Sequence, residues 1–289
     1  MDTIHAGDLE VHVWPGTRAE APVAIAAHGI TANGLSWART AELLDGEVTL
    51  VAPDLRGRAG SRDAPGPYGI GRHADDLVAV LDHLAVSEAV FVGHSMGGFV
   101  AAVSAVRHPS RTTGVVLVDG GLAFPARADL EPDAALQAFL GPALARLEMT
   151  FPSRDSYREF WQAHPAFKGE WTPWIEDYIQ HDLVGSGPFR SSCVAAVVRI
   201  DGAQVLTDAM VQAAIHALPV PGVLLYAERG LLDEPPALYD SARVAGLHVR
   251  TRLVPDTNHY SILLADRGAE VVADHVRRRS ERSHERAGI

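Results

Sequence analysis

Short runs of consecutive apolar residues constrain the fold of this chain more than any other feature. Four of them lie in its first half, at Val23–Ala27, Val48–Ala52, Ala89–Val92 and Val115–Val118. Because they lack the polar alternation of a strand with one face in water, they predict strands buried on both faces, as in a parallel sheet. Val223–Ala227 and His248–Val254 resume the strand pattern near the end of the chain, whereas Leu9–Trp14 alternates like a half-exposed antiparallel strand.

Segments with helical character separate these runs. They are approximately Ser36–Leu44, Arg72–Leu84, Met96–Arg107 and Leu263–Arg279. A chain that alternates strands and helices predicts an α/β fold with a doubly wound, mostly parallel sheet and right-handed crossovers.

A serine stands at a sharp turn between one predicted strand and the next predicted helix. The turn reads Gly93-His94-Ser95-Met96-Gly97-Gly98 and follows Ala89–Val92 directly. A serine at such a turn tends toward positive φ, and glycines remove the side chains that would collide with the neighbouring strand and helix. The turn lifts the hydroxyl above the edge of the sheet, so we expect Ser95 to be a nucleophile.

The serine turn and three further segments resemble the α/β-hydrolase superfamily, and the resemblance runs from end to end of the chain. The segments are Ala26-Ala27-His28-Gly29-Ile30, Ala52-Pro53-Asp54-Leu55-Arg56-Gly57 and Asp256-Thr257-Asn258-His259-Tyr260. The resemblance implies the α/β-hydrolase fold with an inserted helical cap. It also implies that the nucleophile, the acid and the histidine follow one another in that order along the chain.

The resemblance assigns the remaining catalytic groups. A serine hydroxyl is protonated at neutral pH and needs a base, and His259 lies on the loop before the final helix, where the family places its catalytic histidine. Backbone N–H groups of Ile30 and Met96 are expected to bind the oxyanion that develops in acyl transfer. His94 is expected to belong to the turn, with its side chain directed away from the hydroxyl.

The acid that orients His259 is expected beyond the strand Val223–Ala227. Asp233 fits by its position before a proline-started helix, although it could instead cap that helix. Glu228 lies closer to the end of the strand. Asp119, at the end of Val115–Val118, is the other location that some family members use. The prediction is Asp233, with Asp119 and Glu228 as alternatives.

Residues 122–218 interrupt the alternation of strands and helices and contain 11 of the 19 aromatic residues. We interpret them as the helical cap, between a first core segment, residues 1–121, and a second, residues 219–289. Aromatic rings supply large contact areas at little entropic cost, so this concentration predicts an apolar substrate pocket. Trp161, Trp171 and Trp174 are the candidates for substrate binding.

A serine nucleophile forms an acyl-enzyme, so the substrate needs an acyl carbon. We expect hydrolysis of a carboxylic ester or lactone of a medium-sized, largely apolar small molecule. Three alternatives remain open. One is a carbon–carbon bond hydrolase of a dienoic diketone. The others are a non-hydrolytic acyltransferase, cyclase or perhydrolase on the same scaffold, and an inactive binding protein for a small hydrophobic ligand.

Composition excludes several other classes. The formal net charge is −11 and no basic stripe is present, which argues against nucleic-acid binding. The single cysteine, Cys193, precedes an apolar run and is expected to be a buried small hydrophobe. There is no basic stretch leading into an apolar run and no run of 18 apolar residues, so we expect no signal peptide, no membrane span and a cytoplasmic protein.

Neither a metal nor a cofactor is expected. The 14 histidines are scattered, with no His-Glu-x-x-His motif and no paired cysteines. The glycines of Arg56-Gly57-Arg58-Ala59-Gly60-Ser61 follow a strand, but they match the family's loop after Asp54 and not a nucleotide-binding fingerprint.

Overall fold

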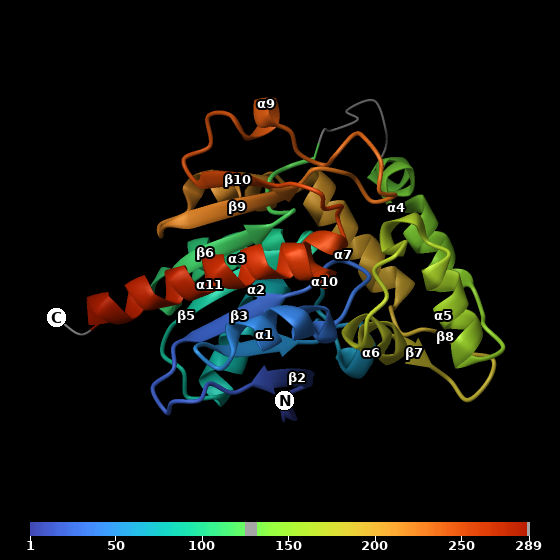
Figure 1. Cartoon of the computed structure of the whole chain (residues 1–289), viewed down its shortest axis with the longest axis horizontal. Helices are drawn as coiled ribbons and strands as arrows, with labels where there is room; N and C mark the ends of the chain where they lie inside the picture. The colour runs from blue at the N-terminus through green and yellow to red at the C-terminus, as the bar shows by residue number, and fades with distance from the viewer. Residues whose placement is uncertain (125–131, 288–289) are drawn as a thin grey trace.

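An eight-stranded sheet runs through the middle of the computed structural model, which describes residues 1–124 and 132–287 (Figure 1). Its order is β1-β2-β4-β3-β5-β6-β9-β10. The pairs β1–β2 and β2–β4 are antiparallel, and every other neighbouring pair is parallel. The predicted mostly parallel sheet is therefore confirmed. The strands are β1 (Asp2–Ala6), β2 (Leu9–Trp14), β3 (Val23–Ala27), β4 (Thr49–Pro53), β5 (Ala89–His94), β6 (Thr112–Val118), β9 (Gly222–Ala227) and β10 (Arg250–Val254).

Helices cover both faces of this sheet. The helices α2 (Ile70–His83) and α3 (Met96–Arg107) pack on one face, whereas α1 (Ala38–Leu44) and α11 (Asp266–Ala287) pack on the other. Figure 1 shows α11 crossing its face of the sheet. The shorter elements of this part are η1 (Gly34–Trp37), η2 (Ala59–Ser61), η3 (Pro109–Arg111), α9 (Ser241–Val244) and α10 (Ser261–Leu264).

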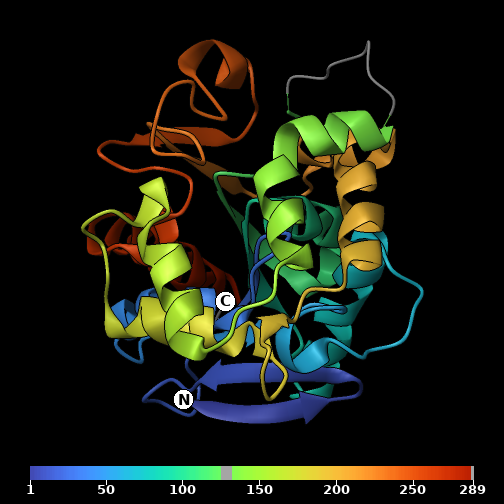
Figure 2. The ribbon, with the colours of Figure 1, turned by 90° about the vertical axis from the view of Figure 1, so that its right-hand side faces the viewer.

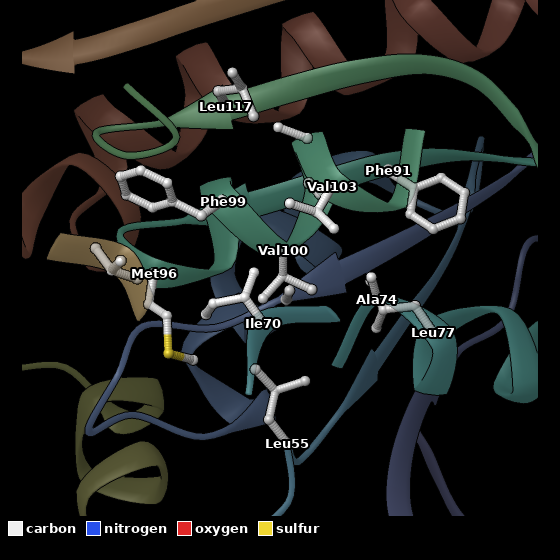
Figure 3. Close-up of a cluster of buried hydrophobic side chains, with 14 of the residues drawn as sticks. Leu55, Ile70, Ala74, Leu77, Phe91, Met96, Phe99, Val100, Val103 and Leu117 are labelled. Carbon is white, nitrogen blue, oxygen red and sulfur yellow. The ribbon is translucent and has the colours of Figure 1, made fainter. Parts of the chain in front are cut away.

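Strand β5 shows why the apolar runs are continuous. Phe91 points into the cluster under α2 and α3, where Figure 3 shows it among Leu77, Val103 and other apolar side chains. Val90 and Val92 on the same strand belong to the cluster under α1 and α11. Because the sheet is buried on both faces, a polar residue at any of these positions would lose its contact with water.

Between β6 and β9 the chain leaves the sheet and forms a group of helices. We call its described part, residues 132–217, the cap. Figure 2 shows these helices toward the viewer, at one end of the sheet. The boundaries predicted at residues 122 and 218 stay a prediction. The elements of the cap are α4 (Pro132–Glu148), α5 (Arg154–Gln162), η4 (Pro165–Phe167), α6 (Pro173–His181), β7 (Leu183–Val184), β8 (Arg190–Ser191), α7 (Ala195–Thr207), α8 (Ala209–Ala213) and η5 (Ala214–Ala217).

The cap has an aromatic core of its own. Tyr157, Trp161 and Phe167 are buried there with Ile175 and Tyr178. Among the described helices of the whole chain, none is both long enough and apolar enough to cross a membrane.

Candidate active site

The turn between β5 and α3 has the geometry expected of an exposed serine. Ser95 adopts φ 55° and ψ −122°, in the left-handed region that side chains rarely occupy. A Cβ atom at Gly93 would lie 1.9 Å from the carbonyl oxygen of Gly97, and one at Gly97 would lie 2.0 Å from that of Ala27. The glycines are therefore required by the close approach of the helix and of strand β3. Ser95 stays partly accessible at the start of α3.

His259 pairs with a buried carboxylate. Its Nδ1 lies 2.6 Å from Oδ2 of Asp119, and the Asp119 side chain is fully buried. Asp119 directly follows β6 and has φ 45°. Its other oxygen, Oδ1, accepts a hydrogen bond from the backbone N–H of Ala227 at 3.0 Å, so the neighbouring strand β9 fixes the carboxylate. This bond leaves Oδ2 for the imidazole.

Asp233, the acid predicted from the sequence, is held by partners other than His259. Asp233 Oδ1 accepts hydrogen bonds from Arg229 Nε at 2.7 Å and from Asn258 Nδ2 at 3.0 Å, and its side chain is 35% exposed. No helix begins near Pro235, because the chain stays irregular from residue 228 to α9. Burial raises the pKa of Asp233, but the bonds from Arg229 and Asn258 outweigh it and lower that pKa overall.

The alternative acid Glu228 also points elsewhere. Its Oε2 accepts a hydrogen bond from the backbone N–H of Asp256 at 2.8 Å and lies 3.7 Å from Arg229. Of the three carboxylates considered, Asp119 is the one that the structure brings to His259.

Ser95 and His259 line the same small cavity, of about 50 Å³, together with Gly29 and Ile30. Because Nδ1 of His259 faces Asp119, its Nε2 lies on the opposite side of the ring. The fold therefore brings together residues that are 164 positions apart in the sequence.

His94 also lines this cavity. Its ring centroid lies 4.7 Å from that of His259, and its Nε2 donates to the His259 carbonyl at 2.8 Å. Burial lowers the pKa of His94 well below its usual value, and the neighbouring His259 adds to this effect. A neutral His94 therefore acts as a hydrogen-bond donor that holds the backbone of His259.

The loop after β3 directs the N–H of Ile30. The carbonyl of Gly29 accepts hydrogen bonds from His28 Nδ1 at 2.7 Å and from the N–H of Ala32 at 3.1 Å. Because a trans peptide is planar, the Ile30 N–H points the opposite way from that carbonyl. Burial lowers the pKa of His28 to about 3, so this donor stays neutral. Within the described residues, neither the Ile30 N–H nor the Met96 N–H has a hydrogen-bond acceptor.

Arg58, which the sequence did not single out, holds the carbonyl of Ile30. The guanidinium is fully buried, and its Nε and Nη2 donate to the Ile30 carbonyl at 3.0 and 2.9 Å. Its Nη1 lies 2.5 Å from Oδ2 of Asp201 on α7. A core loop is thus joined to the cap by a buried ion pair, through residues that no local motif connects.

A larger cavity of about 300 Å³ adjoins the small one, since Leu140, Leu231 and Tyr260 line both. Trp161 lines the larger cavity. The leucine pair Leu231-Leu232 and Tyr260 were not predicted, although Tyr260 follows His259 directly in the sequence.

The other two predicted tryptophans lie elsewhere in the described structure. Trp171 donates to Glu176 at 3.1 Å within the cap. Trp174 donates to the Leu264 carbonyl at 3.2 Å, and the Arg39 guanidinium lies 4.6 Å from its ring centroid. Neither lines the two cavities near Ser95. Their indole rings pack within the cap and between the cap and the core.

Arg146 borders the larger cavity, and its charge is already balanced. Arg146 is 3% exposed and donates through Nη1 to Asp182 at 2.7 Å and to the Tyr157 hydroxyl at 2.6 Å. Its guanidinium also lies 5.0 Å from the ring centroid of Trp161. The cavity wall is therefore mostly apolar, with a neutralised ion pair behind it.

Comparisons with known proteins agree with the fold. The model of the alpha/beta hydrolase fold family matches residues 22–266. The 3-oxoadipate enol-lactonase 2 of Acinetobacter baylyi is 28% identical over 207 residues, which cover 69% of this chain and 72% of that protein. The lipase LipV of Mycobacterium tuberculosis is 38% identical over 124 residues, or 42% of this chain and 47% of that protein. The crystal structure of E-2-(acetamidomethylene)succinate hydrolase shares the fold, with a TM-score of 0.72, 22% identity, and coverage of 95% of this chain and 96% of that one.

Proposed function

The chain belongs to the alpha/beta hydrolase fold family and is a hydrolase, and we propose that it cleaves a carboxylic ester or lactone through an acyl-enzyme on Ser95. The observation that carries this proposal is the small cavity that Ser95 shares with His259, whose ring is held by Asp119.

In the proposed reaction, Ser95 Oγ attacks the acyl carbon while His259 Nε2 accepts the hydroxyl proton. Asp119 keeps the proton of His259 on Nδ1 and stabilises the imidazolium that forms. The N–H groups of Ile30 and Met96 donate to the developing oxyanion. His259 then gives its proton to the leaving alkoxide, and a water molecule hydrolyses the acyl-enzyme by the same steps.

The larger cavity supports a medium-sized, largely apolar substrate. Leu140, Trp161 and Leu231 offer it apolar surface beside the catalytic groups. Because Arg146 is paired with Asp182, the wall favours a neutral group over a carboxylate. This pairing is the reason for placing ester or lactone hydrolysis ahead of carbon–carbon cleavage of a dienoic diketone, which needs a cation for the substrate carboxylate. The enol-lactonase and lipase relatives support cleavage of a lactone or ester bond.

The proposal is tested with p-nitrophenyl esters and with aliphatic and macrocyclic lactones, read against Ser95→Ala. We expect turnover to fall by about 10⁴-fold or more, as in knockouts of other triad nucleophiles. Ser104→Ala is the matched control, because it removes a buried hydroxyl from the same helix, where it donates to the Val100 carbonyl. Retained acyl turnover in the Ser95 variant would exclude the acyl-enzyme. Adding an alcohol acceptor distinguishes transfer from hydrolysis by the product.

The role of the cap in specificity is tested by two tryptophans. Trp161→Ala enlarges the larger cavity, so the ranking of kcat/KM among acyl chain lengths should move toward longer chains. Trp174→Ala removes a ring outside both cavities and should lower the melting temperature without changing that ranking. If both variants keep the parent's ranking, Trp161 serves only the core of the cap.

A further inference from the structure

A second cluster of polar side chains lies where the cap meets the antiparallel edge of the sheet. Glu10 and His12 are two residues apart on β2, so they share one face of the strand. Asp54 follows β4, and His181 ends α6 of the cap. Figures 1 and 2 both show α6 beside β2. One nitrogen or oxygen from each of the four residues lies within 4.8 Å of the others.

One ligand atom in this cluster lacks a hydrogen bond although it is buried. His12 is 2% exposed, and its Nε2 makes no hydrogen bond in the structure. That nitrogen points at Asp54, whose Oδ1 lies 3.5 Å away. A buried imidazole nitrogen without a partner loses the free energy of its bond to water, so an additional partner in this position would stabilise the fold.

The spacing of the cluster is close to that of a tetrahedral ion. His181 Nε2 lies 3.5 Å from Glu10 Oε1 and 2.7 Å from Asp54 Oδ2. Zinc binds imidazole nitrogen and carboxylate oxygen at about 2.0–2.2 Å, which separates neighbouring ligands by about 3.4 Å. To admit the ion, the contact between His181 and Asp54 must open by about 0.7 Å, and the wider pairs, which lie within 4.8 Å, must close toward the same separation.

The carboxylate of Asp54 is already oriented for such a role. Its Oδ1 accepts the N–H of Gly34 at 2.7 Å, and its Oδ2 accepts the N–H of Gly60 at 2.9 Å. Backbone donors that fix a ligating carboxylate are a regular feature of metal sites.

We propose that Glu10, His12, Asp54 and His181 bind a zinc ion that joins the cap to the core. Two imidazoles and two carboxylates supply four protein ligands and leave no open position, which is the coordination number of structural zinc sites. None of the four lines the cavities near Ser95, so the ion is separate from the proposed hydrolysis. The sequence analysis predicted no metal because the ligands come from distant elements and share no motif with short spacing.

The expected consequence is a more firmly attached cap. Asp182 follows His181 and holds Arg146 at the larger cavity, so an ion on His181 would fix the end of α6 beside that wall. The ion binds the folded arrangement and not the unfolded chain, because three separate segments must meet to form the site. Zinc should therefore raise the melting temperature.

The test uses the full chain without a histidine tag, dialysed against a chelator and titrated with Zn²⁺. Calorimetry should show one equivalent of Zn²⁺ bound. Zn²⁺ but not Mg²⁺ should raise the melting temperature, because Mg²⁺ prefers octahedral coordination by six oxygen ligands. His181→Ala should weaken zinc binding at least about tenfold. Co²⁺ should give the visible absorption of a tetrahedral complex in the parent chain only.

The matched control is His108→Ala, which removes a histidine paired with a carboxylate outside the cluster, at 2.8 Å from Asp75. It should bind Zn²⁺ as the parent does. If His181→Ala does not fold, Glu10→Gln keeps the shape of a half-exposed ligand and should show the same loss. The proposal is overturned if the parent chain binds no stoichiometric zinc. It is equally overturned if the ligand variants bind zinc as tightly as the parent.

Discussion

The loops that follow β6 and β9 each carry an aspartate, but the two aspartates differ in burial and in the residue they pair with. Both leave neighbouring parallel strands, and each carries an aspartate with positive φ, 45° at Asp119 and 62° at Asp233. Asp119 is fully buried against His259, whereas the Asp233 side chain is 35% exposed and pairs with Arg229. A carboxylate near the end of a strand is therefore a poor guide to its role. Burial and the partner decide it.

The difference arises from how far each aspartate lies from its strand. Asp119 comes directly after β6, where the N–H of Ala227 on β9 reaches its carboxylate. Asp233 lies beyond the end of β9 in an irregular loop, where Arg229 of the same loop donates a hydrogen bond to it. Four predictions sharpen this contrast.

Asp119→Asn should have the largest effect, lowering kcat by about 10²–10⁴-fold. Asparagine retains an oxygen for the Ala227 N–H but presents an amide N–H to His259, which places the imidazole proton on the wrong nitrogen. Steady-state kinetics measures the loss, and circular dichroism checks that the fold is kept. A nearly normal Asp119→Asn enzyme would remove Asp119 from the proposed mechanism.

Replacing one glycine of each loop by alanine should lower the free energy of unfolding by different amounts. A Cβ at Gly120 would lie 2.0 Å from the carbonyl oxygen of Ser95, which the serine turn holds in place. A Cβ at Gly230 would lie farther from its nearest neighbour, 2.7 Å from the Pro236 carbonyl oxygen, in an irregular loop. Urea unfolding should show a loss of about 3 kcal/mol or more for Gly120→Ala and of about 1 kcal/mol for Gly230→Ala. Equal losses would mean that the two loops are equally rigid.

Asp233→Asn should change kcat by less than about threefold. The variant loses an ion pair with Arg229, but it touches none of the groups placed beside Ser95. The same esters and conditions as for Asp119→Asn give the direct comparison. A fall as large as that of the Asp119 variant would restore Asp233 as the acid and contradict the role proposed for Asp119.

The smallest effect concerns pH. The pKa of Asp233 is lowered in the folded chain, so its ion pair stabilises the fold above the usual aspartate pKa and the contribution disappears as pH falls through the folded value. Because the pair is partly exposed, it is worth less than about 1 kcal/mol. Melting temperatures of the parent and Asp233→Asn should differ slightly at pH 7 and converge in acid or in 1 M salt. A gap that persists in acid would point to packing instead.

The sheet and the serine turn could be predicted from the sequence because local physics determines both. Apolar runs specify strands buried on two faces, and the spacing of Gly93 and Gly97 reflects collisions within one turn. The position of His259 was supplied by the family resemblance.

The proposed acid and the cavities near Ser95 could not be predicted in this way because they depend on contacts between distant segments. Asp119 meets His259 across 140 positions, and an aspartate looks the same in the sequence whether arginine or histidine will face it. The three tryptophans share a segment, but only tertiary packing places Trp161 at the cavity while Trp174 reaches the carbonyl of Leu264.

The buried pair of Arg58 and Asp201 limits how far the cap and the core can be exchanged as modules. A chimera with the cap of another hydrolase would leave Arg58 in a dry site without its counter-charge, a loss of about 3–5 kcal/mol. Without Asp201, the guanidinium would be free to move toward another acceptor and lose its two hydrogen bonds to the Ile30 carbonyl. Recombination or engineering of new caps would therefore have to carry position 58 along with the cap, although that residue belongs to the core.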